Sequence, residues 1–321
     1  MARTPEQIAR QWEALTKKER EMAKEKELSA VQHNEQDRIK SGTIEFIDEY
    51  RGRKVSQFTG ARGGRHYEVE GYQFDFASVT SVTGIVNKFG IPDWYKRKGI
   101  EKATDIMAQP GAQERLALSA TLKNERARKN KNHTWQTELY EEAKSGPQDA
   151  MTLAADFGIE AHEIIERIAM NDVNQKNAQV HESTEYSSII EGFQGWFRDY
   201  DLQIIASELM VYHPAYKYAG TIDLVCQRIG TAELVVIDVK TGGVFDEAAM
   251  QISAYAQALE YLTNDPVSEA WVLQLPRERP DKWDADKLYE VHKLNNISTY
   301  HDAFINALHL KERLSEEAWT I

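Results

Sequence analysis

The order of apolar runs in the second half of the chain constrains the fold more than any other feature. An amphipathic helical stretch is followed by another helix, three runs rich in β-branched residues, a further helix and more β-rich runs. We expect helices at 149–170, 187–200, 246–262 and 297–314, and strands at 204–212, 220–228, 233–239, 269–275 and 288–294. Helices interleaved with strands pack on the faces of a sheet. The sequence therefore predicts an α/β fold with a central mixed β-sheet flanked by helices.

The first half of the chain is more polar. Apolar residues at helical spacing predict a long exposed helix over residues 4–40, either a solvated arm or an oligomerisation or docking helix. Further strands are expected at 43–50, 65–70 and 73–77, and helices at 78–88, from residue 92 onward and at 111–144. Gly146-Pro147 predicts a break. We therefore divide the chain into a mainly helical N-terminal region with a β-hairpin, residues 1–147, and a core, residues 148–321.

Charge and cysteine content limit the class of protein. Residues 1–150 carry 26 Lys and Arg against 23 Asp and Glu, whereas residues 151–321 carry 13 against 28. This split is compatible with uneven solvation or with nucleic-acid binding by the first half. The single cysteine, Cys226, excludes a disulfide, a four-cysteine zinc site and an iron–sulfur cluster built within the chain. With no apolar run of membrane-spanning length and no secretion signal, we expect a cytoplasmic protein.

Two carboxylates and a lysine lie on consecutive predicted strands. Asp238 and Lys240 share a face because side chains alternate along a strand, and Asp223 lies within the preceding strand. If these strands are adjacent and antiparallel, both carboxylates converge at one end of the sheet. Half-buried carboxylates need a partner, and oxygen ligands favour Mg²⁺ or Mn²⁺. The pattern predicts a site that activates a water against a phosphodiester, with Lys240 balancing the remaining charge.

Residues on two predicted helices extend this candidate site. Gln251 and Tyr255 are four residues apart and share a helix face, so their amide and hydroxyl can reach the nucleophile or a phosphate. His162 and Glu166 lie one turn apart on an earlier helix. His162 is a candidate ligand that favours Mn²⁺, and the zincin motif is excluded because residue 166 is not a second histidine.

Together these motifs resemble the RecB-like branch of the PD-(D/E)XK nuclease superfamily, over roughly residues 149–275. The matching motifs are Gly158…His162, Gly220-x-x-Asp223, Asp238-x-Lys240 and Gln251-x-x-x-Tyr255. Thr-Ile-Asp stands where the superfamily has Pro-Asp, a common variant in this branch. The cysteines of its iron–sulfur members are absent, which points to the phage-type group. Residues 65–71 and 78–82 resemble the N-terminal part of phage-type and mitochondrial exonucleases of this branch.

The resemblance implies a restriction-endonuclease-like core and assigns roles to the motif residues. His162, Asp223 and Asp238 would be metal ligands, assisted by a carbonyl near Val239. Glu208 matches the position of a further acid in many members. The resemblance also implies a catalytic Lys240, supported by Gln251 and Tyr255.

Three basic clusters are candidates for binding the DNA backbone. The first cluster contains Arg62 and Arg65, and the third lies at residues 123–131. In the second cluster basic residues follow two aromatic ones, which predicts stacking on unpaired bases; its residues are Trp94, Tyr95, Lys96, Arg97 and Lys98. Phosphate contacts of this kind make binding salt-sensitive. A solvated face is the alternative reading of each cluster.

The leading hypothesis is a Mg²⁺- or Mn²⁺-dependent DNA exonuclease acting on single-stranded DNA or on free ends. It would serve recombination, repair or replication in a bacterial or phage-infected cell. The N-terminal helix would hold a second copy or a recombination or replication partner. The alternatives are an endonuclease of the same fold and a non-cleaving DNA-binding module. Cleavage polarity, DNA versus RNA, and one metal or two stay open.

Overall fold

The computed structural model describes residues 41–47, 51–59, 65–86, 91–110, 137–170, 184–278, 283 and 287–315. Several expectations fall outside these ranges, namely the helix over 4–40, most of the helical stretch 111–144 with its basic cluster, and Arg62. Among the described residues, no helix is both long and apolar enough to cross a membrane.

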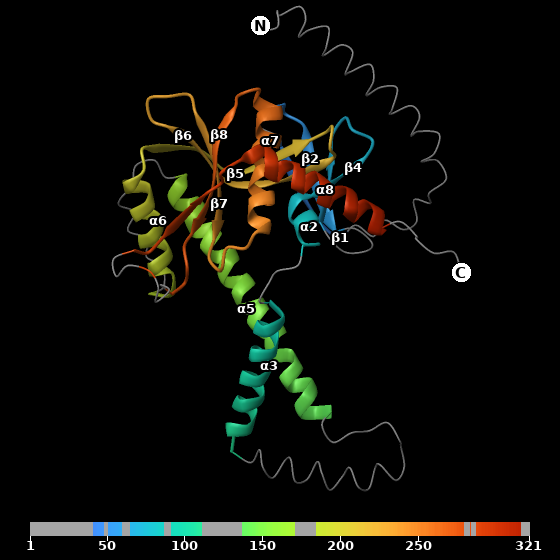
Figure 1. Ribbon diagram of the computed structural model, residues 1–321, viewed down its shortest axis with the longest axis vertical. Coiled ribbons are helices and arrows are strands. Elements are labelled where there is room, and N and C mark those ends of the chain that lie inside the picture. The colour runs from blue at the N-terminus through green and yellow to red at the C-terminus, as the bar shows by residue number, and fades with distance from the viewer. Residues whose placement is uncertain are drawn as a thin grey trace, which may run out of the picture.

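A nine-stranded mixed sheet forms the centre of the described part of the chain (Figure 1). The strand order is β1-β2-β3-β4-β6-β7-β8-β9, and β5 pairs along the remaining edge of β6. The β4–β6 and β7–β8 pairs are parallel, and the others are antiparallel. The strands are β1 (Ser41–Ile47), β2 (Lys54–Thr59), β3 (Arg65–Val69), β4 (Asp75–Ser78), β5 (Leu202–His213), β6 (Tyr218–Arg228), β7 (Leu234–Lys240), β8 (Val267–Gln274) and β9 (Glu290–Lys293). The predicted α/β class with a central mixed sheet is confirmed.

The four N-terminal strands continue the sheet of the second half of the chain. The junction is parallel pairing of β4 with the start of β6, where Ala77 faces Tyr218. Strand β2 was not predicted, because its buried residues Val55 and Phe58 are three apart and break the alternation that marks a strand. The division of the chain at residue 147 stays a prediction.

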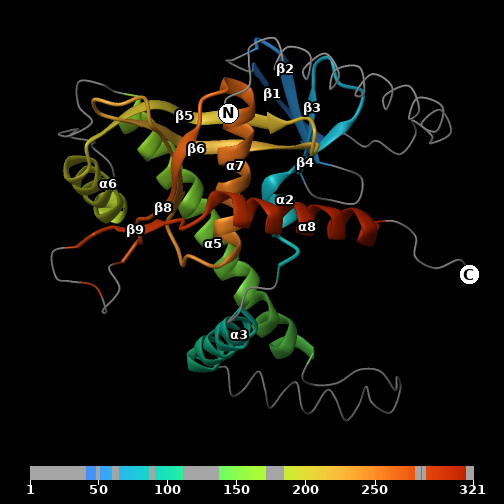
Figure 2. The ribbon, with the colours of Figure 1, turned by 45° about the horizontal axis from the view of Figure 1, so that its top comes forward.

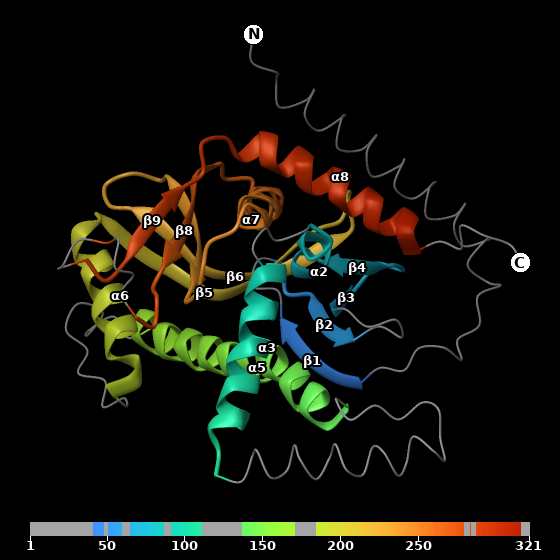
Figure 3. The same ribbon diagram turned by 60° about the horizontal axis from the view of Figure 1, so that its bottom comes forward.

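Helices cover both faces of the sheet (Figure 3). One layer contains α7, α8 and the short α2, and the other contains α5 and α6. Each layer encloses an apolar core, one including Phe304 of α8 and the other Trp196 of α6, both fully buried. The helices are α2 (Val79–Thr83), α3 (Ile91–Ala108), α5 (Thr137–Ala169), α6 (Ser187–Asp199), α7 (Glu247–Thr263) and α8 (Ile297–Ser315), with the 3₁₀ turn η2 (Thr184–Tyr186).

The break predicted at Gly146-Pro147 is wrong, because α5 runs through both residues as one helix. A proline inside a helix removes a backbone hydrogen bond and costs about 3 kcal/mol. Here Gly146 and Pro147 are buried, and a Cβ on Gly146 would lie only 2.7 Å from the carbonyl oxygen of Lys98 in α3. The pair is therefore a close-packing point between two helices. Together α3 and the first half of α5 project from the sheet (Figures 1 and 2).

We predict that Gly220→Ala destabilises the protein by about 1–3 kcal/mol, the usual cost of overpacking a core. A Cβ at Gly220 of β6 would lie 2.6 Å from Cε1 of Tyr255 on α7, which is itself buried. Urea unfolding measures the difference. Gly242→Ala is the matched control, since a Cβ there meets nothing within 4 Å. Equal stability of the two variants would contradict this packing argument.

We predict that stability falls as the pH drops from about 6.5 to 4. Burial, reinforced by the nearby His301, lowers the pKa of His213 to about 4. The folded state therefore resists a proton that the unfolded chain accepts, which costs roughly 3 kcal/mol at the acid end of this window. His213→Phe keeps the ring contacts with Tyr216 and Tyr261. The free energy of unfolding of this variant, measured by urea unfolding, should fall less than that of the wild type between about pH 6.5 and 4. An equal fall in the two proteins would assign the effect to other groups.

Candidate active site

The candidate site lies where β6 and β7 separate. Their pairing ends at Leu224 and Ile237, and the next facing pair in this register would be Asp223 and Asp238. Asp223 instead uses Oδ2 to accept the backbone N–H of Val239, at 2.6 Å. A carboxylate thus replaces a strand partner, and the strands diverge around the two acids. The two strands are adjacent and antiparallel, which is the condition under which the sequence predicts that both carboxylates converge.

Helix α7 brings the amide of Gln251 to Asp238, whose side chain is buried, and the hydroxyl of Tyr255 to that amide. Gln251 Nε2 donates to Asp238 Oδ1 at 2.8 Å and to Tyr255 Oη at 3.3 Å. Lys240 Nζ lies 2.7 Å from Asp238 Oδ2 and donates to Gln251 Oε1 at 3.4 Å. The four side chains form one connected polar network. The alternation expected from the sequence holds, since Asp238 and Lys240 both reach Gln251.

His162 approaches from α5, on the other face of the sheet. Its Nδ1 lies 3.6 Å from Asp223 Oδ1 and 3.9 Å from Glu208 Oε1. One ligand atom from each of these three residues lies within 4.8 Å of the others. Glu208 of β5 is directly across from Asp223, because its two neighbours pair with the two neighbours of Asp223. The structure therefore groups the histidine with two acids from adjacent strands.

Glu208 combines two unfavourable features. Its φ of 50° is in the left-handed region, which costs a residue other than glycine on the order of 1–3 kcal/mol. Its carboxylate also faces that of Asp223 across the strand pair, and like charges so placed repel. Sequence reasoning gave Glu208 only a secondary role, because a positive φ leaves no mark in the sequence when the residue is not glycine. Strain and repulsion at one position indicate a residue placed for chemistry.

The charges at the site depend on one another. Burial alone would lower the pKa of His162, but Asp223, Glu208 and Asp238 outweigh it and raise this pKa to about 9. Burial also opposes the charge of Lys240, whose pKa is nevertheless raised by Asp238 and Asp223. Burial raises the pKa of Asp238 to about 6 against the opposing effect of Lys240, and it raises the pKa of Asp223 as well. The carboxylates therefore favour any positive charge brought among them.

The donor atoms fit a divalent cation. Asp238 Oδ2 is buried and has an ion pair with Lys240, yet no described residue gives it a well-formed hydrogen bond. Carboxylates with a single imidazole suit Mg²⁺ or Mn²⁺. His162, Glu208 and Asp223 form the candidate group, while Asp238, which the resemblance makes a ligand, is held by Gln251 and Lys240 beside it.

The predicted DNA-binding residues lie on separate elements. Those on α3 are Trp94, Tyr95, Lys96, Arg97 and Lys98. Each cation forms an ion pair with an acid of the same helix. Lys96 lies 3.1 Å from Asp93, and Glu101 lies 3.7 Å from Arg97 and 2.7 Å from Lys98. Arg65 begins β3, where its backbone N–H donates to Ser81 Oγ. Their role in binding DNA stays a prediction.

A family model of the PD-(D/E)XK nuclease superfamily matches residues 113–318. This span contains every residue of the candidate site, from His162 to Tyr255, and well over half of the chain. No curated protein matches the chain. The mixed sheet, the acids at the point where β6 and β7 separate and the match itself lead to one conclusion: the chain belongs to the PD-(D/E)XK nuclease superfamily.

Proposed function

We propose that the protein is a Mg²⁺- or Mn²⁺-dependent DNA exonuclease of the RecB-like branch. Membership of the superfamily already implies a nuclease, a hydrolase of phosphodiester bonds. The observation that carries the finer proposal is the joining of His162 on α5 with Asp223 on β6, next to the Asp238, Lys240 and Gln251 network. A histidine on a helix that precedes strands β5 to β7 in the sequence, and a Gln-x-x-x-Tyr motif on the helix that follows them, resemble features of this branch.

The roles of the residues follow from their contacts. A divalent cation held by His162, Glu208 and Asp223, with Asp238 beside it, would polarise the scissile phosphate and acidify a bound water. Lys240 keeps its proton and its positive charge, so it orients the nucleophile and stabilises charge on the phosphoryl group.

Gln251 and Tyr255 position the other groups. The amide of Gln251 contacts both Asp238 and Lys240, which fixes the orientation of each. Burial raises the pKa of Tyr255 well above its ordinary value. Tyr255 therefore stays neutral and acts as a hydrogen-bonding group rather than as a base.

The projecting pair of α3 and α5 supports a substrate with unpaired bases or a free end. Tyr95 is 39% exposed and stands edge-on to Trp94, beside cations whose ion pairs are exposed. Aromatic rings and cations together suit single strands. We propose that this pair holds the substrate strand for the core, in DNA recombination, repair or replication in the cytoplasm of a bacterial or phage-infected cell. Endonuclease action by the same site is the alternative.

We predict that Asp238→Asn and Lys240→Gln each reduce DNA cleavage by at least about 10²–10³-fold, because each removes a charge aimed at the reacting phosphate. The assay follows cleavage on gels with Mg²⁺ or Mn²⁺, using linear, circular, single- and double-stranded DNA labelled at either end. An exonuclease degrades only linear forms, and the label gives its direction.

Lys287→Ala, an exposed lysine outside the site, is the control and should cleave at the wild-type rate. Thermal unfolding confirms that the variants are folded. Wild-type rates from either site variant would show that the assigned site is wrong. Cutting of circular DNA would establish the endonuclease, and strong binding without metal-dependent cleavage would establish a binding module.

We predict that Mn²⁺ stabilises the folded protein by about 2.7 kcal/mol when it exceeds its Kd a hundredfold. The cation relieves the repulsion between Asp223 and Glu208, which face each other across two strands. Asp223→Asn should lose most of this gain in thermal unfolding experiments. Glu233→Gln removes an acid that pairs with Arg228 at the far end of the sheet and should keep the gain. Equal stabilisation of both variants would place the ion elsewhere.

A further inference from the structure

The half of the chain that contains the candidate site has few cations with which to bind the proposed DNA substrate. Residues 151–321 carry 28 acids against 13 basic residues. Between residues 201 and 278 the Lys and Arg residues are Lys217, Arg228, Lys240 and Arg277. Lys240 ends β7 and Arg277 follows the end of the parallel neighbour β8, so these two lie at the same edge of the sheet.

The end of β8 is fixed to the catalytic end of β7. Gln274 faces Lys240 in the parallel pair, and the N–H of Leu275 donates to the carbonyl of Lys240 at 2.8 Å. The side chain of Gln274 also donates to the carbonyl of Gly242, at 2.7 Å. Neighbouring strands are about 4.8 Å apart. Three residues span at most about 10 Å of chain, so the Cα of Arg277 is within about 15 Å of the Cα of Lys240.

The guanidinium of Arg277 lies over an aromatic ring. Its Cζ lies 4.9 Å from the centre of the Phe157 ring, and Phe157 stacks on Tyr186 at 4.8 Å and 13°. The hydroxyl of Tyr186 donates to Glu160. Phe157 belongs to α5 and lies five residues before His162, about 7.5 Å along the helix axis. The two rings are buried while the side chain of Arg277 is 53% exposed.

One carboxylate forms an ion pair with the guanidinium of Arg277. Glu185 of η2 forms an exposed ion pair with Arg277, of a kind that contributes little to stability. A guanidinium presents a planar fork of N–H donors that matches a phosphate in a bidentate manner. A phosphate can therefore displace Glu185 at little cost.

We propose that Arg277 binds a phosphate of the DNA strand that flanks the scissile one, and that Glu185 competes with that phosphate for the guanidinium. This inference rests on the proposed DNA substrate. It assigns Arg277 a positioning role, outside the groups that contact the reacting atoms.

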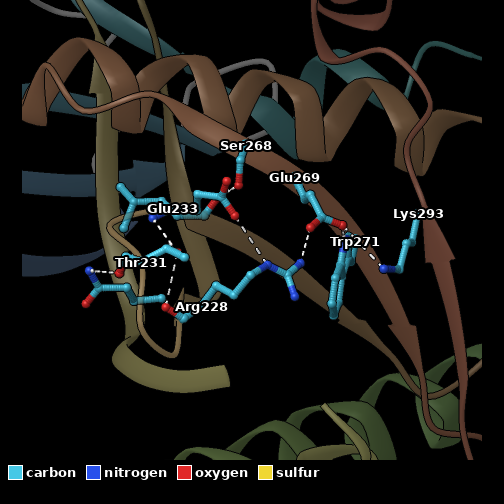
Figure 4. A network of polar contacts seen from close by, with 9 residues as sticks. Arg228, Thr231, Glu233, Ser268, Glu269, Trp271 and Lys293 are labelled. Carbon is cyan, nitrogen blue, oxygen red and sulfur yellow. Dashed lines mark hydrogen bonds and ion pairs between the residues drawn. The ribbon is translucent and has the colours of Figure 1, made fainter. Parts of the chain in front are cut away.

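Arg228 provides the matched control, because it is an arginine of the same sheet with a structural environment (Figure 4). It ends β6 at the edge opposite the site, and its side chain is 30% exposed. Its guanidinium pairs with Glu233 and Glu269, and Glu269 also accepts from Trp271 and Lys293. These contacts connect the β6–β7 turn, β8 and β9, so removing Arg228 should affect stability and not DNA binding.

The experiment measures binding of a labelled single-stranded oligonucleotide by fluorescence anisotropy, without divalent ions, over a range of salt concentrations. Arg277→Ala should weaken binding several-fold and reduce the slope of log affinity against log salt by about 0.7, the value for one phosphate contact on a single strand. Arg277→Lys should keep the slope but bind more weakly, since lysine lacks the planar fork. Arg228→Ala should leave the slope unchanged.

Glu185→Gln should strengthen binding at low salt, and this gain should shrink when Arg277→Ala is also present. If Arg277→Ala does not fold, Arg277→Lys and Glu185→Gln carry the test. An unchanged slope in Arg277→Ala, or an unchanged affinity in Glu185→Gln, overturns the inference while wild-type cleavage of DNA keeps the proposed function. Wild-type protein that neither binds nor cleaves DNA overturns both.

Discussion

The site depends on one hydrogen bond, from the backbone N–H of Val239 to the carboxylate of Asp223. In a regular antiparallel pair that N–H would be donated to the backbone of the facing strand. Because a side chain takes it instead, β6 and β7 can separate without leaving a buried donor unsatisfied. The separation opens the sheet where Asp223 and Asp238 face each other, and residues from both helical layers reach the same point. A continuous ladder would have kept His162 and Gln251 on opposite faces.

The separation also explains the packing of α7 against β6. On the edge opposite β5, β6 pairs with β4 through Tyr218 and Ala219, and with β7 from Leu224 onward. Gly220 lies in the interval between these partners, and the ring of Tyr255 occupies the space that a side chain there would need. The hydroxyl of Tyr255 then meets Gln251, which holds Asp238. The absence of a side chain at Gly220 thus lets Tyr255 take the position from which it contacts Gln251, the partner of Asp238.

Much of this could be predicted from local patterns, and the exceptions have physical causes. Alternation along β7 and the four-residue spacing on α7 place Asp238, Lys240 and Gln251 correctly, because both depend only on strand and helix geometry. The proline of α5 was misleading, since close packing of Gly146 against α3 outweighs the local cost of Pro147. The prediction from sequence also missed β2, whose burial comes from neighbouring strands. Ion pairing of the α3 cations with acids of the same helix could be read from spacing, but their exposure could not.

The distribution of charge is the remaining constraint on the site. Asp223, Asp238 and Glu208 repel the phosphate that the enzyme must approach, and within the folded chain Lys240 and protonated His162 offset only part of that charge. A divalent cation would reverse the sign locally, but it acts over a short range because exposed charges are screened within about 10 Å at moderate salt. The flanking phosphates need cations of their own, which an acidic core provides sparingly. For the proposed DNA substrate, Arg277 would supply such a cation, because its guanidinium lies over the ring of Phe157 and outside the candidate metal group.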